Sequence, residues 1–397
     1  MQSKDIITVL SSNEGIRFIQ NNLNKDPVAL ALKYAGKTSF DLKIALQLIA
    51  IYRKAAQKVP IISKNLLAIN QRSYEQSTSE EVAKYKSTFI SGGKLLDLTA
   101  GIGVDSIYLA ENFEQVEAIE LNQSLHLLAS FNLKKLGVTN IKRIHGDAIE
   151  LLPNRVANWI YVDPDRRSSH RRSVDLRYLK PDILANIDLM KKVASKIYIK
   201  LSPLFDLSEI MRCFDNLASV HVIAEKNEVK EVGIIIDCSL ANETSNAFIH
   251  LADVSNNFRV SVPFEEYFSR KNYTYENNYN KFLHIPSVLV AKSSCFHFFT
   301  NNKGVSKHLN FQIFFSKNSA LTGFRTFGVI DKSSLTLKKI KESLRKNNLN
   351  KLNIVIKGIN ESPAKWHKKL GTTDGGDWFL FLLKSRDNEA ILCRRFI

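Results

Sequence analysis

The sequence predicts an α/β protein with a Rossmann-like sheet, a helical region before the sheet and two small α+β domains after it. In residues 1–90, apolar positions recur at helical spacing. In residues 91–241, short apolar runs alternate with helical segments, which is typical of βαβ units and a parallel sheet. Residues 242–320 lose that alternation and are rich in Asn, Phe and Tyr with short β-like runs, and residues 321–397 follow a strand, helix, strand pattern. We therefore expect four domains with these bounds.

The predicted helices of residues 1–90 have start and stop signals. Asp26 and Pro27 supply an N-cap and a first-turn proline, and Gly36 follows as a stop signal. A longer buried helix ends before Pro60, with basic residues in its last turns. A short amphipathic helix follows, capped by Ser77 or Ser79.

Seven apolar runs are the predicted strands of the central sheet: LLDL (95–98), VEAIE (116–120), IKRIHGD (141–147), WIYVD (159–163), IYIKL (197–201), VHVIAE (220–225) and VGIIID (232–237). Parallel sheets bind ligands at the carboxyl ends of their strands. Four acidic residues stand at such ends: Asp97, Glu120, Asp147 and Asp163. This edge is the predicted functional site.

The amino-acid composition and net charge indicate a globular protein with a polyanionic partner. The 397 residues are 44% hydrophobic and 24% charged, as in a globular protein of several domains. The net charge of +17 favours a polyanionic partner such as nucleic acid. The opening MQSKDIITVL lacks a long apolar stretch, so we expect no signal peptide, and WFLFLL (378–383) is too short to cross a bilayer. We expect a soluble, cytoplasmic protein that does not bind membranes.

The cysteines give no support to a metal site or a disulfide framework. The four are widely spaced and form no CxxC pair: Cys213, Cys238, Cys295 and Cys393. Cys295 and His297, in CFHFF, look like a metal-binding fragment, but burial among aromatic residues is the better interpretation. We therefore predict no metal.

The stretch LLDLTAGIGVDSIYLA (95–110) reads as strand, glycine loop and helix. Gly101 and Gly103 allow the backbone to turn tightly and approach a ligand. A dinucleotide fingerprint requires glycine where this chain has Ser106. A nicotinamide-dependent oxidoreductase is therefore an alternative, and not the preferred interpretation.

The acidic strand ends favour S-adenosylmethionine as the cofactor. Glu120 stands where a carboxylate can accept both ribose hydroxyls, and Asp147 where one can accept from an adenine amino group. Asp97 or Asp105 suits the cationic amine of a methionine moiety better than a pyrophosphate. Each acid taken alone could instead be a helix cap or a loop residue.

The stretch YVDPDRRSSHRR (161–172) follows the fourth strand and is the predicted acceptor site. Asp163 could accept a hydrogen bond from an exocyclic amine or ring N–H, while Pro164 stiffens the turn. The arginines would then meet phosphates beside the target: Arg166, Arg167 and Arg171. The alternative is that Asp165 and the outer arginines form a solvated charged loop.

The fifth strand ends in IKLSP, which places Lys200 and Ser202 beside the same site as substrate-binding residues. Methylation of pyrimidine C5 needs a cysteine nucleophile near this point. The nearest one, Cys213, falls in a later predicted helix. A nitrogen or oxygen acceptor is therefore preferred to carbon.

Several of these motifs together resemble a bacterial family of class I S-adenosylmethionine-dependent methyltransferases. They are EQSTSEEVAKYK, LLDLTAGIGVD, VEAIELN, IHGDA, YVDPDRR, IYIKLSP and NEVKEV. The resemblance covers the whole chain, is specific over residues 73–237, and implies a ferredoxin-like and a C-terminal THUMP-like domain. It also implies that Gln76 and Ser77 close over the methionine end of the cofactor. Two departures are Asp165, where the family often has a small residue, and NEVKE (227–231) in place of NECKE.

The resemblance implies an RNA partner, since THUMP domains bind structured RNA. Residues 331–370 contain eleven Lys or Arg and three acids, a net charge of +8. The lysines fall on a predicted helix and the loop after it. We expect a methyltransferase acting on tRNA or rRNA; a non-catalytic RNA-binding protein is a further alternative, and protein or small-molecule methylation a lesser one. The sequence predicts no oligomeric state.

Overall fold

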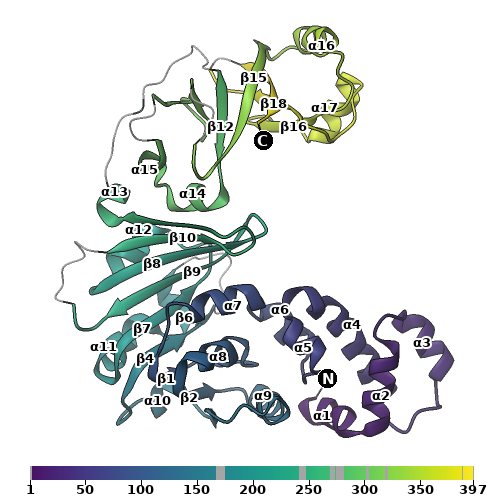
Figure 1. Cartoon of the computed structure of the whole chain (residues 1–397), viewed down its shortest axis with the longest axis vertical. Coiled ribbons are helices and arrows are strands. Elements are labelled where there is room, and N and C mark those ends of the chain that lie inside the picture. Colours follow the sequence, from purple (N-terminus) through teal and green to yellow (C-terminus); the bar gives the residue numbers. More distant parts are fainter. Residues whose placement is uncertain are drawn as a thin grey trace. The chain divides into compact units, whose positions relative to one another are not determined.

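The computed structural model describes residues 2–166, 175–240, 247–268, 273, 281–300, 304–317, 321–386 and 388–396. The chain forms two compact units, drawn together in Figure 1. The first comprises Met1–Lys226 and Lys230–Arg259, and the second Asn227–Val229 and Val260–Ile397. Each unit has apolar cores of its own.

The first unit begins with helices, and those predicted after Asp26, before Pro60 and after Ser79 are among them. They are α1 (Ser3–Ser11), α2 (Asn13–Asn22), α3 (Pro27–Tyr34), α4 (Leu42–Lys58), α5 (Pro60–Lys64), α6 (Gln71–Gln76) and α7 (Glu80–Ser87). The Asp26 carboxylate accepts from the Ala29 N–H at 3.1 Å and caps α3. Ser79 precedes α7 as predicted, but its hydroxyl makes no cap hydrogen bond.

The helical region is joined to the sheet through a shared core. Apolar residues of α1–α5 pack with Val104, Tyr108 and Leu128 of the helices that flank the sheet. In Figure 1 the purple helix α1 lies beside α9 (Gln123–Leu136). Asn132 of α9 accepts from the Ala68 N–H at 2.6 Å and donates to the Ala68 carbonyl at 2.9 Å. This buried pair of bonds fixes the helices against the sheet.

The described residues of this unit form a nine-stranded sheet in the order β11-β10-β8-β9-β7-β4-β1-β2-β3. The strands are β1 (Gly92–Asp97), β2 (Phe113–Glu120), β3 (Ile141–His145), β4 (Ala157–Val162), β7 (Ala194–Leu201), β8 (Leu217–Glu225), β9 (Glu228–Asp237), β10 (Phe248–Asp253) and β11 (Phe258–Pro263). All seven predicted strands are present. The neighbouring strands from β3 to β7 are parallel, and β9 is antiparallel to β7. The predicted Rossmann-like sheet is confirmed.

Short helices connect the strands: α8 (Val104–Leu109), α10 (Ala148–Leu151), α11 (Ile183–Val193) and α12 (Leu207–Cys213). β1 lies between β2 and β4, so the strand order reverses at β1. Ligands bind at such switch points in open α/β sheets. The ends of β1, β2 and β4 therefore meet where the sequence places its acidic residues.

The predicted domain boundary at residue 241 falls inside this sheet. β10 pairs in parallel with β8, and its Ile249 and Leu251 are buried. The sheet therefore continues to β11, where the first unit ends at Arg259. A boundary after β9 would leave these apolar side chains without the strand against which they pack.

The second unit contains a seven-stranded sheet of described residues, in the order β13-β14-β12-β15-β18-β17-β16. Its strands are β12 (Phe282–Pro286), β13 (Ser306–Lys307), β14 (Phe314–Ser316), β15 (Phe324–Ser334), β16 (Asn353–Lys357), β17 (Trp378–Leu383) and β18 (Glu389–Arg395). Strands from the predicted ranges 242–320 and 321–397 thus share one sheet, because β12 pairs with β15. The short helices α13 (Phe264–Phe268), α14 (Val288–Ser293) and α15 (Phe296–Thr300) precede β13.

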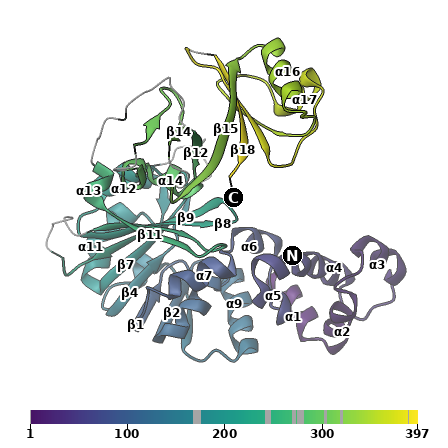
Figure 2. The same ribbon diagram turned by 45° about the horizontal axis from the view of Figure 1, so that its top comes forward.

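Two helices of this unit, α16 (Leu337–Lys346) and α17 (Pro363–Leu370), cover one face of its sheet. Figure 2 shows them together beside β15 and β18. Ile340 and Leu344 of α16 pack with Trp366 and Leu370 of α17 over the sheet. Both helices leave their lysine-rich sides exposed.

Across the described residues, no cluster of three or more His, Cys, Asp or Glu side chains could hold a metal ion. No helix in this part of the chain is both long and apolar enough to span a membrane. Cys295 is buried beside α15, as the aromatic surroundings in the sequence predict.

Candidate cofactor and acceptor site

The loop between β1 and α8 needs glycine at two positions. Gly101 has φ 52° and Gly103 has φ 93°, the left-handed region that other residues rarely adopt. A Cβ atom added at Gly103 would meet no other atom within 4 Å. The loop therefore presents bare backbone to open space, as a ligand-binding loop must.

Asp97 stabilises this loop from the inside. Its carboxylate is 1% exposed, and it accepts hydrogen bonds from the Ser106 hydroxyl and, at 3.1 Å, from the Thr99 N–H. Ser106 occupies the position where a dinucleotide fingerprint has glycine, so its presence has a structural reason in this chain. Direct contact of Asp97 with a cofactor stays a prediction.

Asp97 makes the stability of the protein depend on pH. Burial raises the pKa of Asp97 to about 7, although the bonds from Ser106 and Thr99 oppose that change. Because this value lies above the usual 3.8, the folded state keeps a proton between these pH values that the unfolded state has lost. Wild-type stability therefore falls as pH rises through this window.

We expect Asp97→Asn to remove this dependence, since Asn is isosteric and neutral. The difference in unfolding free energy between the variant and the wild type should grow by roughly 2–4 kcal/mol in favour of the variant as pH rises from 4 to 7. Above pH 7 this difference should stay constant. Urea unfolding of the ligand-free proteins at pH 5, 6, 7 and 8 measures the difference. A difference that does not change with pH would contradict the prediction.

Glu120 and Arg143 hydrogen-bond to the backbone of Gly101 in the glycine loop, one to its N–H and the other to its carbonyl. Glu120 accepts from the Gly101 N–H at 2.7 Å, and Arg143 of β3 donates to the Gly101 carbonyl at 2.9 Å. Glu120 also accepts from the Asn122 N–H at 2.7 Å. A carboxylate has about four lone-pair positions, so it can accept further bonds from a ligand. The sequence did not single out Arg143.

Leu121 is a second residue at this edge that the sequence did not single out. It follows Glu120 at the carboxyl edge of the sheet, and its side chain is 68% exposed. An apolar side chain directly after an acidic strand end is the signal that could have revealed it. Next along the edge, Asp147 uses one carboxylate oxygen to cap α10, accepting from the Ile149 N–H at 2.8 Å. Its other oxygen is not part of that cap.

Asp163 lies directly beside the glycine loop. Its backbone N–H donates to the Thr99 hydroxyl at 2.6 Å, and its carboxylate accepts from Lys200 Nζ at 2.7 Å. The Asp163 side chain is 39% exposed, whereas Pro164 is buried. The structure thus brings the predicted acceptor carboxylate and the predicted cofactor loop together.

Lys200 and Asp105 belong to one cluster of charges. Lys200 Nζ lies 3.6 Å from Asp105 and donates to the Thr78 hydroxyl at 2.9 Å. Thr78 in turn donates to Asp105 at 2.7 Å, and Lys86 Nζ lies 2.8 Å from the same carboxylate. Burial opposes the charge on Lys200, but Asp163 and Asp105 outweigh it and raise the pKa of Lys200 above its usual value. Neither Thr78 nor Lys86 was predicted from the sequence.

The remaining predicted site residues do not contact Asp163 or the glycine loop in the contacts found among the described residues. Gln76 ends α6 and is exposed, while the Ser77 hydroxyl donates to the Tyr74 carbonyl at 2.8 Å. Ser202 accepts from the Leu204 N–H at 3.3 Å within a turn. Arg166 lies in the short strand β5 (Asp165–Arg166), which pairs with β6 (Leu179–Lys180). The predictions for Arg167 and Arg171 fall outside the described residues.

Comparison with known proteins agrees with this architecture. Residues 324–395 match the family described as THUMP domain-like. The chain also aligns with the crystal structure of a "putative methyltransferase" from Porphyromonas gingivalis W83, with a TM-score of 0.84, 24% identity and coverage of 100% of both chains. The chain has the class I methyltransferase fold and carries a THUMP-like domain. The fold class implied by the sequence motifs is confirmed.

Sequence relatives with a named activity match only part of the chain. A tRNA/tmRNA (uracil-C(5))-methyltransferase of Actinobacillus pleuropneumoniae serotype 7 (strain AP76) is 29% identical over 193 residues, which cover 42% of this chain and 48% of the relative. Its counterpart in serotype 3 (strain JL03) is 31% identical over 147 residues, covering 30% and 39%. The chain therefore spans less than half the length of the relatives it matches.

Proposed function

We propose that the protein is an S-adenosylmethionine-dependent methyltransferase that acts in the cytoplasm on a nitrogen atom of a base in tRNA or rRNA. The observation that carries this proposal is the Asp163 carboxylate, held by Lys200 at the end of β4 and bonded through its N–H to Thr99 of the glycine loop. A hydrogen-bond acceptor thus stands next to a loop suited to a nucleoside cofactor.

The residues at the sheet edge fit S-adenosylmethionine. The backbone at Gly101 and Gly103 is open, Glu120 retains acceptor capacity for ribose hydroxyls, and Leu121 offers an apolar surface to an adenine face. Asp147 lies at the adjacent strand end. When bound, the cofactor would supply an electrophilic methyl group.

Asp163 would position the acceptor nitrogen. Its exposed carboxylate can accept a hydrogen bond from an exocyclic amine or ring N–H and so direct the nitrogen lone pair at the methyl group. The methylated nitrogen must lose a proton, which the Asp163 carboxylate would accept. Lys200 keeps the carboxylate in place at 2.7 Å.

Uracil-C5 methylation is the second candidate, because the partial relatives carry that name. C5 chemistry requires a nucleophile that adds to the pyrimidine ring, ordinarily a cysteine. In this chain Ser202 follows β7, and Cys213 lies at the end of α12. The position of the cysteines therefore favours a nitrogen acceptor.

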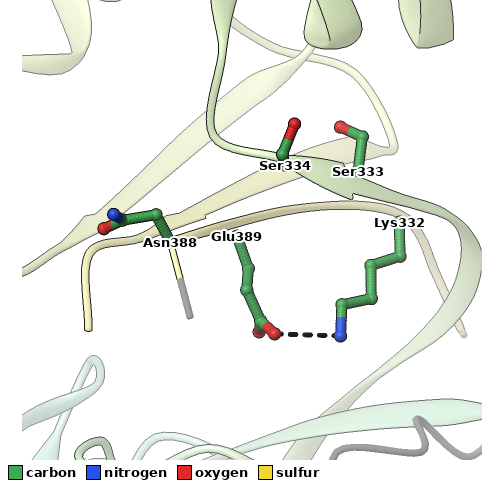
Figure 3. A pocket seen from close by; sticks show the side chains of 5 residues that line it. All are labelled: Lys332, Ser333, Ser334, Asn388 and Glu389. Atoms are coloured by element: carbon green, nitrogen blue, oxygen red, sulfur yellow. Dashed lines mark ion pairs between the residues drawn. The ribbon is translucent and has the colours of Figure 1, made fainter. Parts of the chain in front are cut away.

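The exposed sides of α16 and α17 are the proposed RNA contact of the THUMP-like domain. They carry cations with no ion pair found among the described residues: Lys338, Arg345, Lys346, Lys365 and Lys368. A polar pocket of about 450 Å³ in the same unit is a weaker candidate. In Figure 3 its Lys332 and Glu389 side chains face each other, and at 2.9 Å the pair neutralises the lysine.

We expect replacement of Lys338, Lys346, Lys365 and Lys368 with alanine to weaken tRNA binding about 10- to 100-fold at 150 mM salt. The slope of log affinity against log salt should fall by up to roughly 3–4, because each lost phosphate contact removes about 0.9. Filter binding between 50 and 200 mM salt measures both quantities. The control is Lys339→Ala with Lys369→Ala, since Glu342 and Glu361 already pair with these lysines. Equal effects of the two variants would argue against this surface.

The proposed function is tested with methyl-labelled S-adenosylmethionine and total RNA from a strain that lacks the gene. RNA should become labelled, and digestion to nucleosides should yield an N-methylated base. Labelled 5-methyluridine would establish the second candidate instead. Cofactor binding without labelled RNA would direct the search to protein or metabolite acceptors, and binding of NAD(P)H alone would revive the oxidoreductase alternative.

A further inference from the structure

Lys86 of α7 is a charged side chain that is completely buried behind the site. Its exposed fraction is 0%, and its Nζ atom has three partners. It lies 2.8 Å from Asp105 and 3.0 Å from Glu231, and it donates to the Tyr161 hydroxyl at 2.9 Å. Lys86 thus connects the cofactor loop helix α8 with strands β4 and β9.

Two tyrosines complete the surroundings of this lysine. Tyr161 of β4 and Tyr198 of β7 are register partners, and their rings stack 5.4 Å apart. The Tyr198 hydroxyl donates to Glu231 at 2.9 Å. The Tyr198 ring passes directly over the Cα atom of Gly233, where there is no room for a side chain. Glu231 is 2% exposed, so both of its oxygens are bonded in the interior.

The contacts form a line of alternating charges that ends in the proposed acceptor site. The order is Glu231, Lys86, Asp105, Lys200 and Asp163. Three carboxylates alternate with two ammonium groups, so one negative charge is unbalanced. The Asp163 end is 39% exposed, while every other member is at most 14% exposed in its side chain. The unbalanced charge is therefore presented where a cationic methyl donor would lie.

Stability alone does not explain such a line. Replacement of a buried ion pair by apolar residues of similar size is often neutral or stabilising, because two charges must be desolvated to form it. Lys86 and Glu231 touch no open surface, so solvation does not favour them either. An apolar pair could not fix the positions of Asp105, Lys200 and Asp163, whereas the charges of Lys86 and Glu231 can.

We propose that Lys86 and Glu231 are positioning residues for methyl transfer: they fix Asp105, and through Lys200 they fix the Asp163 carboxylate. This inference rests on the proposed function and deepens it. Loss of Lys86 leaves Asp105 with Lys200 as its ion-pair partner among the described residues, so Lys200 moves toward Asp105 and away from Asp163. The acceptor carboxylate then loses its orientation although its own residue is unchanged.

The test compares Lys86→Met with the double variant Lys86→Met and Glu231→Met. The single variant leaves Glu231 buried without its cation and should lose roughly 10 °C in Tm. The double variant should regain most of that Tm. It should still show kcat about 100-fold below wild type, with the KM for S-adenosylmethionine within about threefold, because an ångström of misplacement costs about that much.

A matched control uses the Lys196–Asp237 pair, which joins β9 to the start of β7, away from Lys200 at the other end of that strand. Lys196→Met with Asp237→Asn should leave kcat within about twofold of wild type. If the Lys86 and Glu231 double variant regains kcat together with Tm, the pair is only structural and the inference is overturned.

A second measurement does not depend on activity. Crystal structures of the wild type and the double variant should differ at Asp163. In the double variant the Asp163 carboxylate should be displaced from Lys200, and the 2.7 Å contact between them should be broken. An unchanged contact would overturn the inference. Failure of the wild type to label RNA would instead count against the proposed function, and this structural comparison would still decide the role of Lys86.

Discussion

Replacing Asp163 with alanine should abolish methyl transfer and leave S-adenosylhomocysteine binding nearly unchanged. The carboxylate is the exposed acceptor at the end of β4, whereas the contacts proposed for the cofactor come from the glycine loop, Glu120 and Leu121. Loss of both positioning and proton acceptance should lower kcat by roughly 10³-fold or more. Single-turnover transfer of labelled methyl groups and calorimetric binding measure the two effects.

Asp163→Asn is the matched variant for this experiment. Its amide oxygen can still accept a hydrogen bond, but it is a poor base and pairs less well with Lys200. We expect a loss of roughly 10- to 100-fold, between wild type and alanine. Turnover of Asp163→Ala equal to that of the wild type would remove Asp163 from the reaction.

Gly233→Ala should be the most damaging small substitution in the sheet. A Cβ atom there would lie 1.9 Å from the Tyr198 hydroxyl oxygen and 2.3 Å from the ring carbon that bears it. Tyr198 is fully buried and bonded to Glu231, so it cannot move aside without loss of that bond. We expect a loss of about 3 kcal/mol in unfolding free energy, or roughly 6–12 °C in Tm.

The control for this prediction is Gly328→Ala, also within a strand. The nearest atom to a Cβ at Gly328 would be 3.9 Å away, an ordinary contact. Its Tm should change by no more than roughly 2–3 °C. Thermal unfolding followed by circular dichroism compares the two variants, and equal shifts would contradict the packing argument.

Local patterns were sufficient to predict the sheet of the first unit. Strand runs bounded by turns and helices specify βαβ units, and all seven predicted strands formed. The domain boundary at 241 failed for a physical reason. β10 joins β8 by hydrogen bonds between distant segments, and no local pattern in the sequence encodes that pairing.

Several predicted site residues form hydrogen bonds within the protein that their spacing in the sequence could not reveal. Asp97 is bonded to Ser106 and Thr99, and Asp105 to Thr78 with Lys86 alongside. An acid at a strand end can serve a ligand or the protein itself. The difference depends on which side chains from other segments reach it.

The sequence by itself determined the fold class, the edge of the sheet that carries the candidate site, and the glycine loop with its acidic strand ends. These follow from short-range rules: alternation of apolar runs, glycine where φ is positive, and carboxyl ends of parallel strands on one edge. The line from Glu231 through Lys86 to Asp163 was decided only by the tertiary structure. Tyr161-Val162-Asp163 and Tyr198-Ile199-Lys200 look unrelated in the chain, and they become partners because β4 and β7 pair in register. From the local pattern, Lys86 is one more polar residue of an amphipathic helix. Its burial depends on neighbours that the local sequence does not contain, so the sequence could not predict it.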